Sequence, residues 1–352
     1  MFKKIIKSLF VCPYFLFSSL YFFLFKINFL KTKQFKNLFV LSVGNLTVGG
    51  AGKTPFILLL SKLLSREKIK HAIISRGYKK NRKGNIYMMP SDKTLKYDSL
   101  SFGDEPFLLF KALKNVPVFV GNKILSLLKM EEVFSGKVAL LDDGFQTHGL
   151  FKNINILLLD CSLKASSYSL LPLGLLREPL KEIKRADVVI LTKTNLSNSK
   201  NLFYLKKQFG AFIDSKKQLV LTAELLFSVF SFKNKCFTEI SAVLLDSKNL
   251  ISLCGVANPL SFKFGLDKLN IKTSKDFVFA DHHKYSPKNI KKILSFCKNN
   301  EVSSIITTKK DLYKIKNYFE NFQLYVVDIE HKILESSRLE NYLKKSLMRN
   351  FK

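Results

Sequence analysis

A glycine-rich segment between an apolar run and an amphipathic stretch constrains the fold of this chain more than any other feature. Residues Leu38–Val43 have the character of a buried strand, and Thr54–Lys68 has the apolar spacing of a helix. The glycines between them allow the backbone to curve so that its N–H groups surround a phosphate, and the N-terminus of the following helix adds a partial positive charge. The sequence therefore predicts a phosphate-binding loop within an α/β sheet.

The residues of this loop have separate expected roles. The Lys53 ammonium can reach the β- and γ-phosphates of a nucleotide, and the Thr54 hydroxyl can ligate Mg²⁺. The strict pattern of such loops, G-x-x-x-x-G-K-[ST], has glycine where this chain has Thr47, so the loop is a variant of it. The strand and helix expected on either side argue against a chance occurrence of Gly-Lys-Thr. The residues expected to bind the phosphates of ATP are Thr47, Gly49, Gly50, Ala51, Gly52, Lys53 and Thr54.

Two carboxylates end another apolar run about 90 residues further along the chain. The run Lys137–Leu141 is followed directly by Asp142 and Asp143. Magnesium takes hard oxygen ligands and commonly binds one or two carboxylates together with phosphate. With Thr54, these two acids are the predicted Mg²⁺ ligands.

Short apolar runs alternate with helical patterns from residue 38 onwards, which predicts a mostly parallel sheet with helices on both faces. Further strands are expected at His71–Ser75, Val116–Val120, Ile154–Asp160 and Val188–Thr192. A second alternating series begins at Leu250, after a polar stretch at 196–220 that resembles a connection. The predicted organisation is a membrane-associating segment at 1–30, a phosphate-loop domain at 31–215 and a smaller α/β domain at 216–352.

The N-terminus is apolar and flanked by lysines. Residues Leu9–Phe25 carry no charge, and as a helix they would extend roughly 25 Å, which is marginal for crossing a bilayer. Lysines on both sides would also suit a segment lying in the interface of an anionic membrane. A buried core helix is the alternative. Membrane attachment is the favoured interpretation, with spanning and lying flat both left open.

Composition alone decides little about partners. The 58 basic and 27 acidic residues give a net charge of +31, which suits nucleic acid, acidic lipid headgroups or phosphorylated substrates. The accompanying abundance of Phe, Asn and Ile could instead reflect the base composition of a genome. No known nucleic-acid-binding pattern is present, so no nucleic-acid partner is expected. The five cysteines are scattered without a Cys-x-x-Cys pair, which favours free thiols and a domain facing the cytoplasm.

The string from Val43 to Pro55 resembles the signature of the tetraacyldisaccharide 4′-kinases, which share a threonine at the position of the first glycine. The other segments that match this family occur in the same order, and they are Ile74–Tyr78, Gly103–Pro106, Leu141–Gln146, Leu171–Pro179, Asp281–Tyr285 and Thr307–Asp311. One departure follows Gln146, where the family has histidine directly and this chain has Thr147 and then His148.

The resemblance implies transfer of the γ-phosphate of ATP to the 4′-hydroxyl of a tetraacylated glucosamine disaccharide 1-phosphate, with Mg²⁺ as cofactor, in lipid A biosynthesis. It implies that Asp104 and His282 form an acid–base pair, without indicating which of them takes the substrate proton. Arg76, Arg177 and Gln146 are implied to bind substrate. The implied location is the cytoplasmic face of the inner membrane, as a peripheral or monotopic protein bound to the membrane surface, with no obligate protein partner.

Other interpretations of the same residues remain. Asp104 could merely cap a helix, and His282 could be an ordinary loop histidine. A membrane-associated P-loop ATPase acting as a switch or positioning protein would have a similar loop, but that class generally has a second lysine where this chain has Val48. A GTPase is disfavoured because the guanine-reading Asn-Lys-x-Asp is missing, and Thr192–Asn195 resembles it only weakly.

Overall fold

The computed structural model describes residues 32–77, 84–91, 99–113 and 115–350, and the predicted membrane-associating segment at 1–30 lies outside them. Within this part of the chain, no helix is both long enough and apolar enough to cross a membrane.

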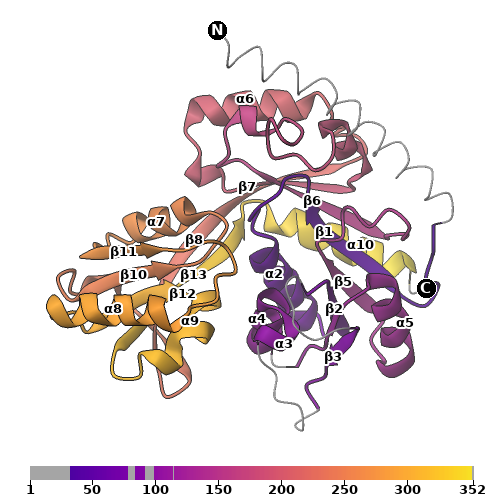
Figure 1. The fold of residues 1–352 in the computed structure, drawn as a ribbon. Coiled ribbons are helices and arrows are strands. Elements are labelled where there is room, and N and C mark those ends of the chain that lie inside the picture. The colour runs from indigo at the N-terminus through magenta and orange to yellow at the C-terminus, as the bar shows by residue number, and fades with distance from the viewer. Residues whose placement is uncertain (1–31, 78–83, 92–98, 114, 351–352) are drawn as a thin grey trace.

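The strands of the described residues form one thirteen-stranded sheet, with the order β11-β10-β12-β13-β8-β7-β6-β1-β5-β2-β4-β3 and β9 beside β8. Figure 1 shows that the sheet and its helices form two lobes, which we call the N-terminal and C-terminal lobes. The strands of the N-terminal lobe are β1 (Phe39–Asn45), β2 (His71–Ser75), β3 (Ile86–Met88), β4 (Val118–Val120), β5 (Val138–Asp142), β6 (Ile154–Asp160) and β7 (Val188–Thr192). Its helices are α2 (Lys53–Arg66), α3 (Ser99–Phe102), α4 (Asp104–Ala112), α5 (Lys123–Val133) and α6 (Ser199–Gly210), with short 3₁₀ turns η1 (Ala165–Ser167), η2 (Leu180–Arg185) and η3 (Thr194–Leu196).

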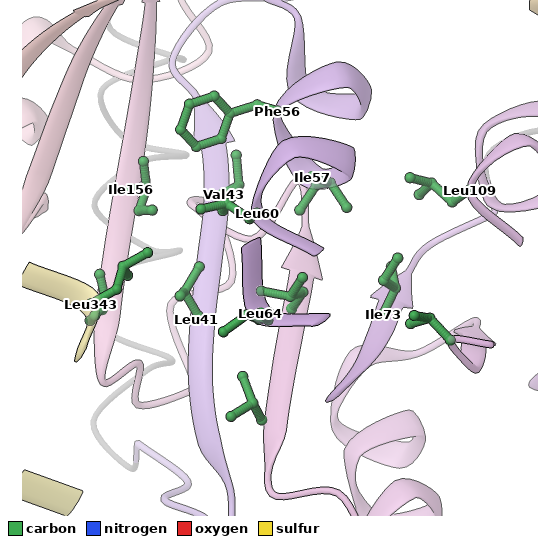
Figure 2. Close-up of a cluster of buried hydrophobic side chains, with 14 of the residues drawn as sticks. Leu41, Val43, Phe56, Ile57, Leu60, Leu64, Ile73, Leu109, Ile156 and Leu343 are labelled. Carbon is green, nitrogen blue, oxygen red and sulfur yellow. The ribbon is translucent and has the colours of Figure 1, made fainter. Parts of the chain in front are cut away.

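Strand β1 is buried along its whole length because helices cover both faces of the sheet. Its odd-numbered residues Phe39, Leu41 and Val43 pack against α2, as Figure 2 shows for Leu41 and Val43. Val40 points to the opposite face and joins a second core with α5. This alternation follows from the two-residue period of a strand. The predicted mostly parallel α/β fold is confirmed.

Helix α6 occupies part of the polar stretch that the sequence analysis treated as a connection. The Asn198 side chain accepts a hydrogen bond from the backbone N–H of Asn201 and so caps the helix N-terminus. Leu205 and Phe209 are buried one turn apart, while most of the other side chains remain partly or fully exposed. Such a narrow apolar stripe leaves the segment polar on average, which is why it resembled a connection in the sequence.

The C-terminal lobe is built on a ribbon of two long strands. Its strands are β8 (Leu219–Lys233), β9 (Cys236–Ile240), β10 (Leu250–Cys254), β11 (Lys275–Val278), β12 (Ser304–Thr308) and β13 (Gln323–Ile333). Its helices are α7 (Pro259–Lys268), α8 (Pro287–Asn299) and α9 (Lys309–Ile315), with turns η4 (Ala242–Leu244) and η5 (Lys316–Tyr318). The beginning of β8 pairs in parallel with β7, and the rest pairs antiparallel with β13. The β8–β13 ribbon therefore joins the sheets of the two lobes.

The last helix, α10 (Ser336–Asn350), returns from the ribbon to the N-terminal lobe (Figure 1). Leu339, Leu343 and Leu347 recur every four residues and enter the same core as Leu41 and Phe56. Figure 2 shows Leu343 in the same cluster as Ile156 of β6. The predicted division at residue 216 stays a prediction, but the packing places this helix with the N-terminal lobe.

We expect Leu343→Ala to lower the free energy of unfolding by about 2–5 kcal/mol, because it leaves a cavity in the shared core. Leu343 is 2% exposed, whereas Met348 on the same helix is 65% exposed. Met348→Ala is therefore the matched control, with an expected change within about 0.5 kcal/mol. Urea unfolding measures both. Equal losses in the two variants would contradict the docking of α10 described above.

Candidate active site

The carboxyl ends of β1, β2, β5 and β6 meet at one edge of the N-terminal lobe, because neighbouring parallel strands point the same way. The glycine-rich loop leads from β1 to α2 at this edge, and Asp142 ends β5. Open parallel sheets bind ligands outside this edge. The predicted phosphate loop and the predicted metal ligands thus lie together.

Thr47 stands where the strict loop pattern has glycine, and its side chain is buried. The Asn45 side-chain amide donates to the Thr47 carbonyl at 2.8 Å and to its hydroxyl at 3.0 Å. The Val48 N–H donates to the Leu175 carbonyl at 2.8 Å, which ties the loop to a neighbouring segment. The hydroxyl of threonine is accommodated because it accepts a hydrogen bond from a buried amide.

Two side chains that the sequence analysis did not single out bind carbonyl groups of the loop. The Lys193 ammonium donates to the Gly50 carbonyl at 2.7 Å and forms a buried ion pair with Asp160. His331 of β13 contacts the Gly52 carbonyl through Nε2 at 2.9 Å. The segment around Lys193 had shown only a weak similarity to a guanine-reading motif, and His331 belongs to none of the motifs identified in the sequence.

Asp142 has one satisfied and one unsatisfied carboxylate oxygen. The Ser75 hydroxyl donates to Oδ2 at 3.0 Å, whereas Oδ1 is buried and has no hydrogen-bond partner among the described residues. Burial raises the pKa of Asp142, and so does the charge of Asp143, while Lys53 and Lys123 oppose the rise. A buried carboxylate oxygen that lacks a donor suits a bound cation.

Asp143 is held by cations. Both terminal nitrogens of Arg177 donate to its carboxylate at 3.1 Å, and the Lys53 ammonium lies 3.5 Å from Oδ1. Burial acts to raise the pKa of this carboxyl, but Lys53 and Arg177 outweigh burial and hold the pKa far below its usual range. Asp143 is therefore ionised at any pH at which the protein is expected to work.

Asn45 connects three of the predicted site residues. Its side-chain oxygen accepts hydrogen bonds from Lys53 at 3.0 Å and from Arg177 at 2.7 Å. Its backbone carbonyl accepts a hydrogen bond from the Gln146 side chain at 2.8 Å. Arg76 is exposed just beyond the carboxyl end of β2, so it lies at the same edge of the sheet but outside this cluster.

Lys123 is a third cation of the cluster that the sequence analysis missed. It is buried at the start of α5, and its ammonium donates to the Asp143 carbonyl and, at 3.4 Å, to the Thr147 hydroxyl. Burial lowers the pKa of Lys123 to about 8, although Asp143 and Asp142 act to raise it. Lysine is so common in this chain that no sequence pattern marked this one.

The donor set suits a hard divalent cation that also binds phosphate. No group of three or more His, Cys, Asp or Glu side chains in the described ranges is arranged to hold a metal on its own. Asp142 and Asp143 offer carboxylate oxygens, and Thr54 lies in the first turn of α2. Two carboxylates and a hydroxyl, completed by phosphate and water, would form a coordination shell typical of Mg²⁺.

Asp104 and His282, which are 178 positions apart, meet across the two lobes. His282 Nδ1 lies 2.9 Å from Asp104 Oδ2, and the Lys314 ammonium donates to the same oxygen at 2.6 Å. Burial acts to raise the pKa of Asp104, but the hydrogen bonds from His282 and Lys314 and the charges of Lys314 and Lys310 lower it overall. Phe107 of α4 packs edge-to-face on Tyr313 of α9 beside this cluster.

The adjacent histidine faces elsewhere. His282 has a positive φ of 60°, which is uncommon for a residue other than glycine, and its ring faces Asp104. His283 instead contacts the Asn289 side chain at 3.0 Å and stacks on Phe279 at 4.6 Å. The geometry therefore separates a histidine at the inter-lobe site from one that packs within the C-terminal lobe.

Glu105 is a further carboxylate of the site that the sequence analysis treated only as part of a motif. It follows Asp104 in the first turn of α4. Burial and repulsion from Asp142 raise the pKa of Glu105 to about 7, against the opposing charges of Lys53, Lys310 and His282. Glu105 therefore lies within electrostatic reach of both the carboxylate pair and the inter-lobe cluster.

His148, at the departure from the family pattern, lies in an ion cluster. Its Nε2 contacts the buried Glu178 at 2.6 Å, and Arg185 contacts its Nδ1 at the same distance. Arg185 also pairs with Glu178 and lies 4.5 Å above the Phe145 ring. His148 supports the turn that follows β5, whereas the neighbouring Thr147 accepts the hydrogen bond from the Lys123 ammonium.

A cavity of about 510 Å³ lies beside the glycine-rich loop, between the two lobes. The N-terminal lobe contributes residues 47–51 and Asp160 to its lining. The C-terminal lobe contributes Asn258, Ser261 and Phe264 of the α7 region. The cavity is continuous with the loop that was predicted to bind phosphates.

Comparisons with known proteins agree with this arrangement. The family model of the tetraacyldisaccharide-1-P 4′-kinases matches residues 5–348. A tetraacyldisaccharide 4′-kinase of Aquifex aeolicus is 34% identical over 327 residues, which cover 92% of this chain and 91% of that protein. Another from Halothermothrix orenii is 30% identical over 305 residues, which cover 83% of this chain and 79% of that protein.

A solved structure also resembles this one. The crystal structure of LpxK from Aquifex aeolicus in complex with ATP superposes with a TM-score of 0.71 at 30% sequence identity. The match covers 97% of this chain and 98% of that one. The likeness therefore extends over both lobes.

Arg177→Met should lower the free energy of unfolding by about 1–3 kcal/mol, because a half-buried carboxylate loses a bidentate charged partner. Arg66→Met is the matched control, since Arg66 is exposed and pairs with Glu340 at 2.9 Å on the surface. We expect a loss of at most about 1 kcal/mol there. Urea unfolding without ligands measures both, and a larger loss for Arg66→Met would refute the assignment of Arg177 to a buried cluster.

Proposed function

The chain belongs to the tetraacyldisaccharide-1-P 4′-kinase family, and from this starting point we propose how its residues move the γ-phosphate of ATP to the 4′-hydroxyl of a tetraacylated disaccharide 1-phosphate. It is a kinase of lipid A biosynthesis that acts on a lipid disaccharide. The observation that carries the mechanism is that Asp104 and His282 meet across two lobes beside the loop, Lys53 and the carboxylate pair. A switch ATPase has no need of such acceptor-side groups, and the relatives compared are named as 4′-kinases.

The phosphates of ATP would lie in the cradle formed by Thr47, Gly49, Gly50, Ala51, Gly52, Lys53 and Thr54. The cavity of about 510 Å³ beside the loop would take the nucleoside, because it is continuous with the cradle and has both apolar and polar walls. Since Phe264 and Ser261 come from the C-terminal lobe, the nucleotide would contact both lobes.

Thr54, Asp142 and Asp143 would hold Mg²⁺. Oδ1 of Asp142, which has no partner among the residues that the structure describes, supports this assignment, because a bound cation would satisfy it. The ion would offset negative charge on the transferring phosphoryl group. Lys53 would contribute a second positive charge at the phosphates, while Arg177 keeps Asp143 ionised and oriented.

The Asp104–His282 pair would accept the proton of the 4′-hydroxyl. Because the two groups share a hydrogen bond of 2.9 Å, the pair as a whole would act as the proton acceptor. Lys314 keeps Asp104 charged, and this holds an imidazolium in place once His282 carries the proton. Arg76 lies outside the carboxylate cluster, so its guanidinium would be available to bind a phosphate of the substrate. Gln146 would support the loop through its hydrogen bond to the Asn45 carbonyl.

Attachment to the cytoplasmic face of the inner membrane is part of the proposal. The lysine-flanked apolar segment at 1–30 and the net charge of +31 support it, because both favour an anionic lipid surface. The substrate is itself a lipid, so an enzyme held at the membrane would meet it there. The division into a phosphate-loop domain at 31–215 and a domain at 216–352 would place the two halves of the site on separate domains.

Purified protein incubated with radiolabelled ATP, Mg²⁺ and a tetraacylated disaccharide 1-phosphate should produce a bisphosphorylated lipid. Lys53→Ala should lower kcat/KM by roughly 10³-fold or more, because phosphoryl transfer depends on charge placed at the phosphates. Lys62→Ala, on the same helix but exposed, should retain activity. Hydrolysis of ATP at an undiminished rate without the lipid acceptor would count against the kinase assignment.

The Asp104–His282 pair can be tested with a double-mutant cycle. Because either substitution alone breaks a shared function, Asp104→Ala plus His282→Ala should be hardly slower than the more damaged single variant. ATP affinity should stay within about threefold in all three variants, a difference below about 1 kcal/mol. His283→Ala is the control and should be near wild type. Losses in kcat that multiply would mean that the two residues act independently.

A further inference from the structure

His331 is the side chain of the interlobe ribbon that lies against the phosphate loop. It is 4% exposed, and its ring packs edge-to-face on Phe56 of α2 at 5.6 Å. Its Nε2 lies 2.9 Å from the carbonyl oxygen of Gly52, the residue that caps α2 and precedes Lys53. A side chain at position 52 would bring a Cβ to within 2.5 Å of that nitrogen, so the imidazole and the glycine fit together closely.

The tautomer of this histidine is set by its hydrogen-bond partner, and its charge is set by burial. A carbonyl oxygen only accepts hydrogen bonds, so Nε2 carries the proton and donates it. Burial lowers the pKa of His331 to about 4, although the hydrogen bond to Gly52 acts to raise it. His331 is therefore neutral at neutral pH, and it provides a donor without adding a charge near the phosphates.

The other nitrogen of the same ring lowers the stability of the fold. Its Nδ1 is buried and has no hydrogen-bond partner among the described residues. An unpaired buried nitrogen is destabilising, and an apolar side chain of similar size would fill this space without it. Stability alone thus favours a hydrophobic residue at position 331, and the bond from Nε2 to the loop is what the imidazole adds.

We propose that His331 is a positioning residue that orients the phosphate-binding end of the loop. This inference rests on the proposed binding of ATP at that loop. The Gly52 carbonyl also accepts the N–H of Phe56, so His331 occupies its second acceptor site and fixes the Gly52–Lys53 peptide from two directions. Because a trans peptide is planar, holding its carbonyl also directs the Lys53 N–H out of the helix N-terminus, toward the phosphates.

The strand that bears His331 also forms part of the sheet of the C-terminal lobe. Residues 323–327 of β13 pair with β12 in the C-terminal lobe, whereas His331 lies further along the strand, opposite Leu225 of β8. The strand that carries the C-terminal lobe therefore ends on the phosphate loop. His331 links the position of the ribbon to the geometry of the nucleotide site.

The test compares ATP affinity with stability. His331→Leu keeps the bulk and removes the donor, and we expect it to weaken ATP binding about tenfold, measured by calorimetry with purified full-length protein. Its KM for the lipid acceptor should be unchanged, and its thermal unfolding without nucleotide should occur at the wild-type temperature or higher. His331→Gln retains a donor and should restore most of the affinity. Lys332→Gln, exposed on the same strand, is the control and should match wild type.

The outcomes separate this inference from the function on which it rests. If wild-type protein binds no ATP, the proposed function fails. If wild type binds ATP and folded His331→Leu binds it equally well, the inference is overturned while the function stands. If His331→Leu does not fold, His331→Gln and His331→Asn differ by one methylene and only the longer amide should reach the carbonyl; equal ATP affinity of those two also overturns the inference.

Discussion

Two adjacent carboxylates at the buried end of β5 impose the requirement around which the rest of the site is arranged. Burying like charges side by side is strongly unfavourable unless cations or a metal offset them. Lys53 and Arg177 contact Asp143 directly, and Lys123 binds its backbone carbonyl. These cations come from α2, from the segment before η2 and from α5. Their contacts with Asp143 therefore hold three distant parts of the chain together at the end of β5.

The second half of the site depends on how the lobes meet. Asp104 begins α4 in the N-terminal lobe, and its carboxylate is reached by His282, Lys310 and Lys314 of the C-terminal lobe. Like that of Asp143, the pKa of this acid is lowered by the cations around it, against the effect of burial. The net charge of +31 thus has a local counterpart, because lysine or arginine side chains contact the acids of both clusters.

Local patterns in the sequence were sufficient to predict the strand–loop–helix unit at the phosphate site and the two acids at the end of β5. The spacing of apolar residues, the glycines of the loop and the end of an apolar run can each be recognised within a few residues. The Asp104–His282 pairing was implied only by family resemblance, since no local pattern joins positions so far apart. Lys123, Lys193 and His331 were missed because each acts by donating to a backbone carbonyl, which any suitably placed donor can do. Helices α6 and α10 each bury only a narrow stripe of leucine or phenylalanine among polar residues, so their low apolar content did not mark them as buried elements.

The packing of α10 has a consequence for biosynthesis. A chain leaves the ribosome N-terminus first, so β1 and α2 are made long before the helix that covers them. Until residues 336–350 have emerged, Leu41 and Phe56 lack part of their apolar surroundings, and exposed apolar surface of this kind makes an incomplete chain prone to aggregation. The nucleotide-binding half of the enzyme is thus the first to be synthesised and among the last to be completed.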